Sequence, residues 1–142
     1  MTDKTAVVVV GGGYAGVLAA NRLTQRKDVA VTLVNPRPDF VERIRLHQLV
    51  AGSDDAVVDY ASVLAGRVRL VVDTAVRIDV PGRSIALESG ATLDYDHLVY
   101  AVGSGSAASS VPGAATFAFA LTSLEEAERL REQRRKAEGD AT

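Results

Sequence analysis

The 142-residue chain has no cysteine and only two histidines. The absence of cysteine excludes disulfides, thiolate metal sites and a redox-active dithiol on these residues. The two histidines form no His-Glu-x-x-His arrangement, so the sequence predicts no metal site. The chain also has no excess of basic residues, and its formal net charge is −2. We therefore expect no nucleic-acid partner.

Long apolar runs are also absent. No run approaches the ~18–20 apolar residues that a bilayer-spanning helix needs, so we expect no transmembrane segment. The first residues lack the basic region, apolar stretch and cleavage site of a secretory signal. A cytoplasmic location is the resulting expectation. With 47% hydrophobic and 24% charged residues, the composition is that of a globular domain.

A glycine-rich turn follows a run of four valines near the start of the chain. Val7–Val10 suit a strand that is buried on both faces, as in a parallel sheet. Gly11, Gly13 and Gly16 follow at the spacing G-x-G-x-x-G, and a helix is predicted over 14–25. Here the first glycine allows a tight turn, the second lets a pyrophosphate approach, and the third lets helix and strand pack closely. The pattern predicts a dinucleotide site at a helix N-terminus, and the alternative is a purely structural turn.

The remaining pattern predicts further short elements. A buried strand over 29–34 completes a β-α-β unit. Two short helices are expected over 40–50 and 55–64. In the first, Ile44 would face the core together with Phe40 or Val41, and Asp54 or Asp55 would cap the second.

From Arg67 onward, short apolar segments alternate with turn residues such as Pro81-Gly82. This alternation predicts antiparallel hairpins. Thr122-Ser123-Leu124-Glu125 is typical of a capping box and predicts the start of a helix. The predicted strands are 68–72, 75–80, 84–88, 92–93, a buried 98–102 and a short 116–121.

Two motifs together resemble a known family. The first is Gly11-x-Gly13-x-x-Gly16-x-x-x-Ala20, and the second is Leu-Asp-Tyr-Asp-His-Leu-Val-Tyr-Ala-Val-Gly-Ser at residues 93–104. They resemble the FAD-dependent oxidoreductases with two dinucleotide-binding domains, in particular type II NADH dehydrogenases and apoptosis-inducing-factor-like proteins of the pyridine nucleotide-disulfide oxidoreductase family. The resemblance covers roughly residues 5–130.

The resemblance implies an α/β fold in which a Rossmann-like FAD-binding domain spans residues 1–121. Its parallel sheet would carry an antiparallel β-meander insert over about 74–94, and residues 122–142 would form a connector helix and tail. The implied cofactor is FAD, and catalytic residues are not identified. The implied FAD contacts are Gly11, Gly13, Tyr14, Ala15, Gly16, Asn35, Arg37, Arg43, Val76, Ala101, Gly103 and Ser104.

Several polar residues near these motifs leave alternatives open. Asn35 stands where the family usually has Asp or Glu to bind the adenosine ribose. It is either a neutral ribose contact, part of an NADP(H) site in which Arg37 meets a 2′-phosphate, or a turn residue. Arg43 and Arg45 could contact the cofactor phosphates or the flavin edge, or lie on a solvated face. His47 could approach the flavin ring or be a surface or packing residue.

The sequence also departs from the family in length. After Gly105 no second glycine fingerprint follows, although the family uses one to bind NAD(P)H. We therefore expect the N-terminal portion of an NAD(P)H-dependent, NADH:quinone-reductase-like flavoprotein that is not active alone, with NAD(P)H as co-substrate only in a complete enzyme. Self-association or a complementing chain is expected. The alternatives are a non-catalytic nucleotide-binding module or an NADP(H)-binding domain, whereas a short-chain dehydrogenase is disfavoured because no Tyr-x-x-x-Lys occurs.

Overall fold

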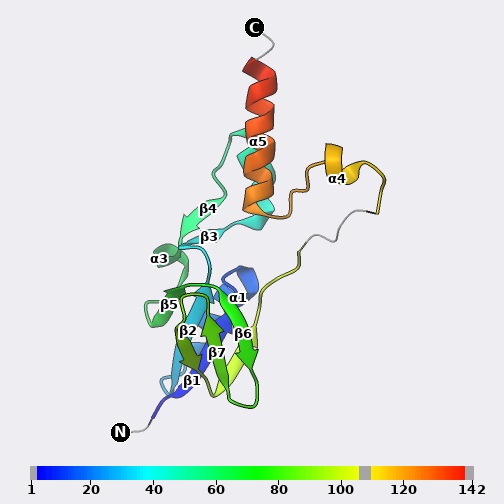
Figure 1. The fold of residues 1–142 in the computed structure, drawn as a ribbon. Helices are drawn as coiled ribbons and strands as arrows, with labels where there is room; N and C mark the ends of the chain where they lie inside the picture. The colour runs from blue at the N-terminus through cyan, green and yellow to red at the C-terminus, as the bar shows by residue number, and fades with distance from the viewer. Residues whose placement is uncertain (1–2, 106–109, 140–142) are drawn as a thin grey trace. The chain divides into compact units, whose positions relative to one another are not determined.

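The computed structural model describes residues 3–105 and 110–139, and Figure 1 follows the chain through them. The chain divides into two compact units. Unit 1 comprises Met1–Phe40 and Val58–Gly103, and unit 2 comprises Val41–Val57 and Ser104–Thr142. Each unit contains at least one apolar cluster of its own. No helix among the described residues is both long and apolar enough to cross a membrane.

A four-stranded parallel sheet forms the centre of unit 1. The chain enters it at β1 (Thr5–Val10), crosses through α1 (Tyr14–Leu23) and returns in β2 (Val29–Asn35). β5 (Val68–Val72) then pairs with β2, and β9 (His97–Tyr100) pairs with β1. The strand order is β5-β2-β1-β9, and every pairing is parallel. The predicted β-α-β unit and parallel sheet are therefore confirmed.

A second sheet in unit 1 is antiparallel. Its strands are β6 (Ala75–Asp79), β7 (Ser84–Leu87) and β8 (Thr92–Asp94), in the order β6-β7-β8. Turn residues between the strands allow such sequential antiparallel pairing. The predicted β-meander is confirmed.

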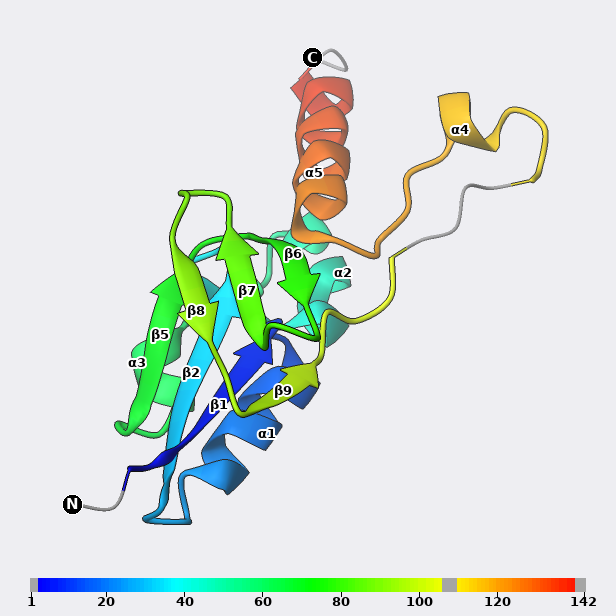
Figure 2. The ribbon, with the colours of Figure 1, turned by 60° about the horizontal axis from the view of Figure 1, so that its bottom comes forward.

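Both faces of β1 are covered, which explains the unbroken valine run. Val7 and Val9 belong to an apolar cluster that includes α1, whereas Val8 and Val10 belong to a cluster that includes Ile85 of β7. Figure 2 shows α1 and the three-stranded sheet on opposite faces of the parallel sheet. Alternate side chains of a strand point to opposite faces, so a strand between two layers is apolar at every position.

The other elements are short, except the last helix. β3 and β4 form a two-stranded sheet, and α2 packs on α5 within unit 2. The unit 2 cluster consists of Leu46, Leu49, Ala56, Leu124 and Ala127. The elements are β3 (Asp39–Val41), η1 (Arg43–Arg45), α2 (Leu46–Ala51), β4 (Val57–Asp59), α3 (Tyr60–Val63), α4 (Ala114–Phe117) and α5 (Leu124–Gly139).

The predicted helix over 40–50 is wrong in its first half. Phe40 lies in strand β3, and α2 begins only at Leu46. Leu46 and Leu49, three residues apart on one face of α2, are buried, whereas Ile44 is 71% exposed. Ile44 lies in the short 3₁₀ turn before α2, so it does not share the apolar face of that helix.

The predicted helix over 55–64 is also wrong in its first half, and only α3 (Tyr60–Val63) forms within that range. Residues 57–59 form β4, and Asp59 caps the short α3 by accepting a hydrogen bond from the Ala61 N–H at 2.8 Å. Asp54 instead accepts from the Ala56 N–H at 2.7 Å. Ala56 has φ +56°, a left-handed conformation that interrupts a right-handed helix.

Two predicted strands are present but differ in their surroundings. Residues 68–72 form β5, which is parallel to β2 and belongs to the main sheet, so the prediction of an antiparallel hairpin is wrong there. The buried strand over 98–102 is the shorter β9, in which Tyr100 is 67% exposed. β9 ends the order of the described sheet, and an edge strand has one open side.

Two predictions near the end of the described chain also need correction. No strand forms over 116–121, where α4 ends at Phe117. The capping box lies one residue later than expected. Ser123 Oγ accepts from the Glu126 N–H at 3.3 Å, and the Glu126 carboxylate accepts from the Thr122 N–H at 3.2 Å. α5 accordingly begins at Leu124.

Candidate dinucleotide-binding site

The glycine-rich loop joins the end of β1 to the start of α1 in unit 1. Gly11 has φ +105°, a conformation that side chains rarely adopt. Its N–H donates to the Val34 carbonyl at 2.9 Å, and a Cβ here would run into the Ala101 carbonyl. Backbone conformation and neighbouring backbone therefore both require glycine at residue 11.

The other two motif glycines differ sharply from each other. A Cβ at Gly16 would run into the Gly11 carbonyl oxygen, so this glycine allows helix and loop to pack closely. Gly13 has φ −81°, and a Cβ there would meet no heavy atom within 4 Å. Neither its conformation nor its packing explains a glycine at residue 13, and the structure leaves open space beside it.

Gly13 is also the N-cap residue of α1, which has no side-chain cap hydrogen bond. Its carbonyl accepts the Val17 N–H at 3.0 Å. The N–H groups of the first turn of a helix have no partner four residues back, and the helix dipole places partial positive charge there. Tyr14 and Ala15 are exposed at this end. The arrangement suits an anionic group such as a phosphate.

The remaining loop glycine, Gly12, is buried, and both its N–H and its carbonyl form hydrogen bonds to side chains. Its N–H donates to Asn35 Oδ1 at 3.1 Å, and its carbonyl accepts from the Tyr60 hydroxyl at 2.6 Å. Asn35 Nδ2 donates in turn to the Arg37 carbonyl at 2.9 Å. Burial, together with the negative charge of Asp39, raises the pKa of Tyr60 to about 12, so its hydroxyl stays protonated near neutral pH.

The second predicted motif meets the first at Gly11. Ala101 N–H donates to the Val10 carbonyl at 2.8 Å, and the Ala101 carbonyl faces the position where a Gly11 Cβ would lie. Gly103 follows with φ +75°. Two segments about ninety residues apart in the sequence are thus adjacent, because β1 and β9 are neighbouring parallel strands whose carboxyl ends share one edge of the sheet.

Other predicted contacts occupy less distinctive positions. The Tyr14 ring stands edge-on to Phe40, with ring centroids 5.2 Å apart. Val76 is 59% exposed, where the pairing of β6 with β7 shifts register. In unit 2, Arg43 Nη2 donates to the Ser104 carbonyl at 2.9 Å. Whether these residues contact a cofactor stays a prediction.

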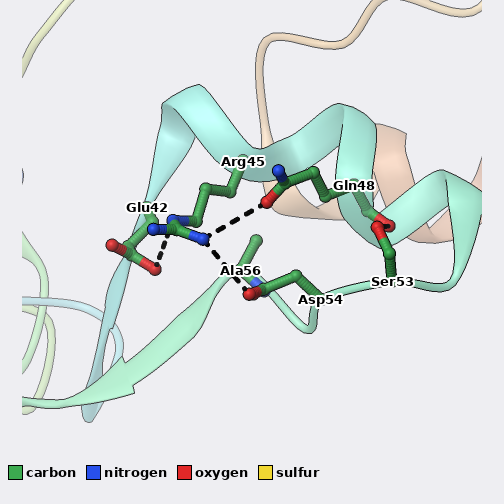
Figure 3. Close-up of polar contacts among 6 residues, drawn as sticks. All are labelled: Glu42, Arg45, Gln48, Ser53, Asp54 and Ala56. Carbon is green, nitrogen blue, oxygen red and sulfur yellow. Dashed lines mark hydrogen bonds and ion pairs between the residues drawn. The ribbon is translucent and has the colours of Figure 1, made fainter.

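Arg45, considered as a flavin contact, is part of a polar cluster in unit 2 (Figure 3). Its guanidinium lies 3.3 Å from a Glu42 carboxylate oxygen and 3.4 Å from an Asp54 carboxylate oxygen, and it donates to Gln48 Oε1 at 3.4 Å. These contacts favour a structural role for Arg45. His47 is exposed.

Tyr60 is the contact residue that sequence reasoning missed. The sequence predicts only a core or half-buried aromatic here, whereas the structure places the hydroxyl on the Gly12 carbonyl. A buried tyrosine hydroxyl usually finds a hydrogen-bond partner. That expectation predicts a hydrogen bond for the Tyr60 hydroxyl. It does not identify the acceptor, because Gly12 lies 48 positions away in the sequence.

Comparison with known proteins identifies the family. The family model described as "Pyridine nucleotide-disulphide oxidoreductase" matches residues 5–138. The chain belongs to this family. Members of the pyridine nucleotide-disulphide oxidoreductase family are generally flavin-dependent, so the resemblance stated from the two motifs is confirmed at this level.

Curated relatives of the chain include quinone oxidoreductases. The alternative NAD(P)H-ubiquinone oxidoreductase C1 of Arabidopsis thaliana is 32% identical over 95% of this chain and 30% of its own length. The type II NADH:quinone oxidoreductase of Staphylococcus haemolyticus is 28% identical over 90% of this chain and 33% of its own length. The chain thus spans about a third of the length of these relatives.

Solved structures agree on the fold. The sulfide:quinone oxidoreductase of Aquifex aeolicus superposes with a TM-score of 0.79 at 23% identity, covering 95% of this chain and 32% of that one. A NAD-dependent persulfide reductase from A. fulgidus gives a TM-score of 0.72 at 27% identity, covering 93% and 28% of the two chains. The Rossmann-like fold class is therefore confirmed.

Proposed function

We propose that the chain binds FAD, with the pyrophosphate over the glycine-rich loop, and that it forms the flavin-binding part of an NAD(P)H:quinone oxidoreductase. The observation that carries this proposal is the open space at Gly13 beside the uncapped N-terminus of α1. Gly11 and Gly16 are required by the protein itself. Gly13 is not, so a ligand that must approach the backbone explains its presence.

The residues of unit 1 fit the group. Gly13, Tyr14 and Ala15 are exposed at the helix N-terminus, where N–H groups can bind the pyrophosphate. Asn35 lies at the end of β2, beside the loop. After its bonds to Gly12 and Arg37, its amide still has one N–H and one lone pair for a ribose hydroxyl.

The flavin would accept a hydride and pass electrons to an acceptor, while the protein supplies position and electrostatics. We propose that these residues alone do not oxidise NAD(P)H at an enzyme-like rate. A hydride donor must be held about 3–3.5 Å from its acceptor, and the family uses a second glycine fingerprint for the donor. The nicotinamide-binding part would come from further sequence or from a complementing chain.

A pair of glycine variants tests FAD binding. Gly13→Val should abolish most FAD binding, because a branched side chain would fill the approach of the pyrophosphate. Gly66→Val is the matched control, since a Cβ at Gly66 also meets nothing within 4 Å and its φ is not left-handed. Titration with FAD, followed by flavin fluorescence and by calorimetry, measures both affinities, and thermal unfolding compares their stabilities.

We expect similar unfolding temperatures for the two variants and weakened FAD binding for Gly13→Val alone. Equal FAD affinity in the two variants would remove the phosphate-loop proposal. A tighter complex of the wild-type chain with NADP(H) than with FAD would instead favour the alternative nucleotide, in which Arg37 meets the 2′-phosphate.

A further inference from the structure

Two hydrogen bonds fix both peptides that flank Gly12. The N–H of Gly12 belongs to the peptide that begins at Gly11, and it donates to Asn35 Oδ1 at 3.1 Å. The carbonyl of Gly12 belongs to the next peptide, and it accepts from the Tyr60 hydroxyl at 2.6 Å. Because a peptide is planar and trans, the Gly12 carbonyl and the Gly13 N–H point in opposite directions. The Tyr60 hydroxyl therefore also sets the direction of the Gly13 N–H.

Tyr60 is well suited to hold this geometry. Its side chain is buried, with 2% of the residue exposed, and its ring stands edge-on to Phe40 at 6.2 Å between centroids. Phe40 contacts Tyr14 in the same way at 5.2 Å. The hydroxyl is thus carried by a packed aromatic group that extends to the exposed end of α1.

The loop itself would be mobile without such a contact. Gly12 and Gly13 are adjacent glycines, and glycine adopts many backbone conformations at little steric cost. A Cβ at Gly12 would run into the Tyr60 hydroxyl and would lie 2.9 Å from Asn35 Cγ. The Cβ position of Gly12 therefore points at the side chains of Tyr60 and Asn35, whereas the Cβ position of the neighbouring Gly13 points into open space.

We propose that Tyr60 is a positioning residue for dinucleotide binding. By holding the Gly12 carbonyl on the buried side, it directs the Gly13 N–H toward the pyrophosphate on the open side. Asn35 supports the same geometry through the preceding peptide. The assignment rests on the proposed function, since it concerns the loop that would bind FAD. Loss of the hydroxyl lowers the fraction of chains whose loop is ready to bind, and affinity falls by that fraction.

The test is Tyr60→Phe, which removes only the hydroxyl and keeps the packed ring. Asp96→Ala is the control, because Asp96 also makes a side-chain hydrogen bond to β1, donated by the Ala6 N–H at 2.7 Å, at the opposite end of the strand. The Kd for FAD is measured by calorimetry, and ³¹P NMR reports the environment of the bound pyrophosphate. Tyr60→Phe should raise the Kd about tenfold and shift the pyrophosphate resonances. Asp96→Ala should leave both unchanged.

The outcomes separate this assignment from the proposed function. A wild-type chain that binds no FAD overturns the proposed function and this assignment with it. Wild-type binding with an unchanged Kd and unchanged ³¹P resonances in Tyr60→Phe overturns only the assignment. If Tyr60→Phe does not fold, Gly12→Ala carries the test, because its Cβ faces the Tyr60 hydroxyl and not the open side. An unchanged Kd in Gly12→Ala would equally overturn the assignment.

Discussion

The two units of this chain are stabilised in different ways. Unit 1 contains two apolar clusters, one on each face of a parallel sheet. Buried side chains such as Tyr60 also make hydrogen bonds to its backbone. The described residues of unit 2 form one cluster of five buried residues, supplemented by ion pairs near the surface. The proposed phosphate loop belongs to the unit whose backbone is fixed by burial.

The ion pairs of unit 2 contribute less than their number suggests. Arg134 and Glu138 are paired at 2.8 Å, yet their side chains are 49% and 61% exposed. Exposed pairs contribute about 0–1 kcal/mol each, because water and salt screen them. We therefore expect the stability of unit 2 to depend on its few buried leucines.

The largest effect is expected in the centre of unit 1. Leu33 is fully buried in β2, whereas Leu18 on α1 is 73% exposed. Leu33→Ala should lower the free energy of unfolding by about 3–5 kcal/mol, through lost burial and a cavity that packed layers cannot close. Leu18→Ala should change it by less than about 0.5 kcal/mol. Urea denaturation followed by circular dichroism measures both, and equal losses would contradict the layered core.

A smaller and more local effect is expected in unit 2. Leu49 is 2% exposed in α2, and Ile44 is 71% exposed just before that helix. Leu49→Ala should lower the stability of α5 by about 2–3 kcal/mol, while Ile44→Ala should be nearly neutral. Amide hydrogen exchange resolves the two units. If Leu49→Ala accelerated exchange in β1 as much as in α5, relative to the wild type, the two units would not be separate in stability.

Alkaline pH should reveal the buried Tyr60 hydroxyl. Its pKa is raised to about 12 in the folded chain, whereas an unfolded tyrosine has a pKa near 10. Its stabilising contribution is complete below about pH 10 and is lost as the pH rises toward 12, by at most about 2–3 kcal/mol.

Denaturation of the wild type and Tyr60→Phe at several pH values between 9 and 12 measures that contribution. The difference between their unfolding free energies should shrink as the pH rises, since the phenylalanine variant has no hydroxyl to ionise. A constant difference would mean that the hydroxyl is accessible to solvent.

The smallest effect is expected at the start of α5. Ser123 Oγ accepts the Glu126 N–H at 3.3 Å, and a Ser→Ala change at such a cap costs about 1 kcal/mol. Ser123→Ala should reduce the protection of the first turn of α5 by that amount, and Ser123→Asp should preserve it. Hydrogen exchange at Glu126 measures the change, and equal protection in the alanine and aspartate variants would exclude a cap.

Several features of this protein could be predicted from local sequence. The run Val7–Val10 indicated a strand covered on both faces, because only such a strand is apolar at every position. Gly11 and Gly16 indicated a tight turn and a close helix, and both lack room for a Cβ. Pro81-Gly82 marked a turn between antiparallel strands. In each case the signal lies in a few consecutive residues, even where the atoms that impose the constraint, such as the Ala101 carbonyl beside Gly11, come from a distant segment.

Other features were decided only by the tertiary structure. Whether residues 68–72 pair in parallel or antiparallel depends on which strand lies next to them, and their apolar pattern is the same in both cases. Ile44 and Leu46 are both apolar, but Leu46 is buried and Ile44 is exposed, because α2 begins at Leu46 and leaves Ile44 outside the helix. The Tyr60 contact required the chain to bring α3 beside the glycine-rich loop. The local sequence thus determined the tight backbone turn of the glycine-rich loop, and packing between distant segments determined which side chains hold that loop in place.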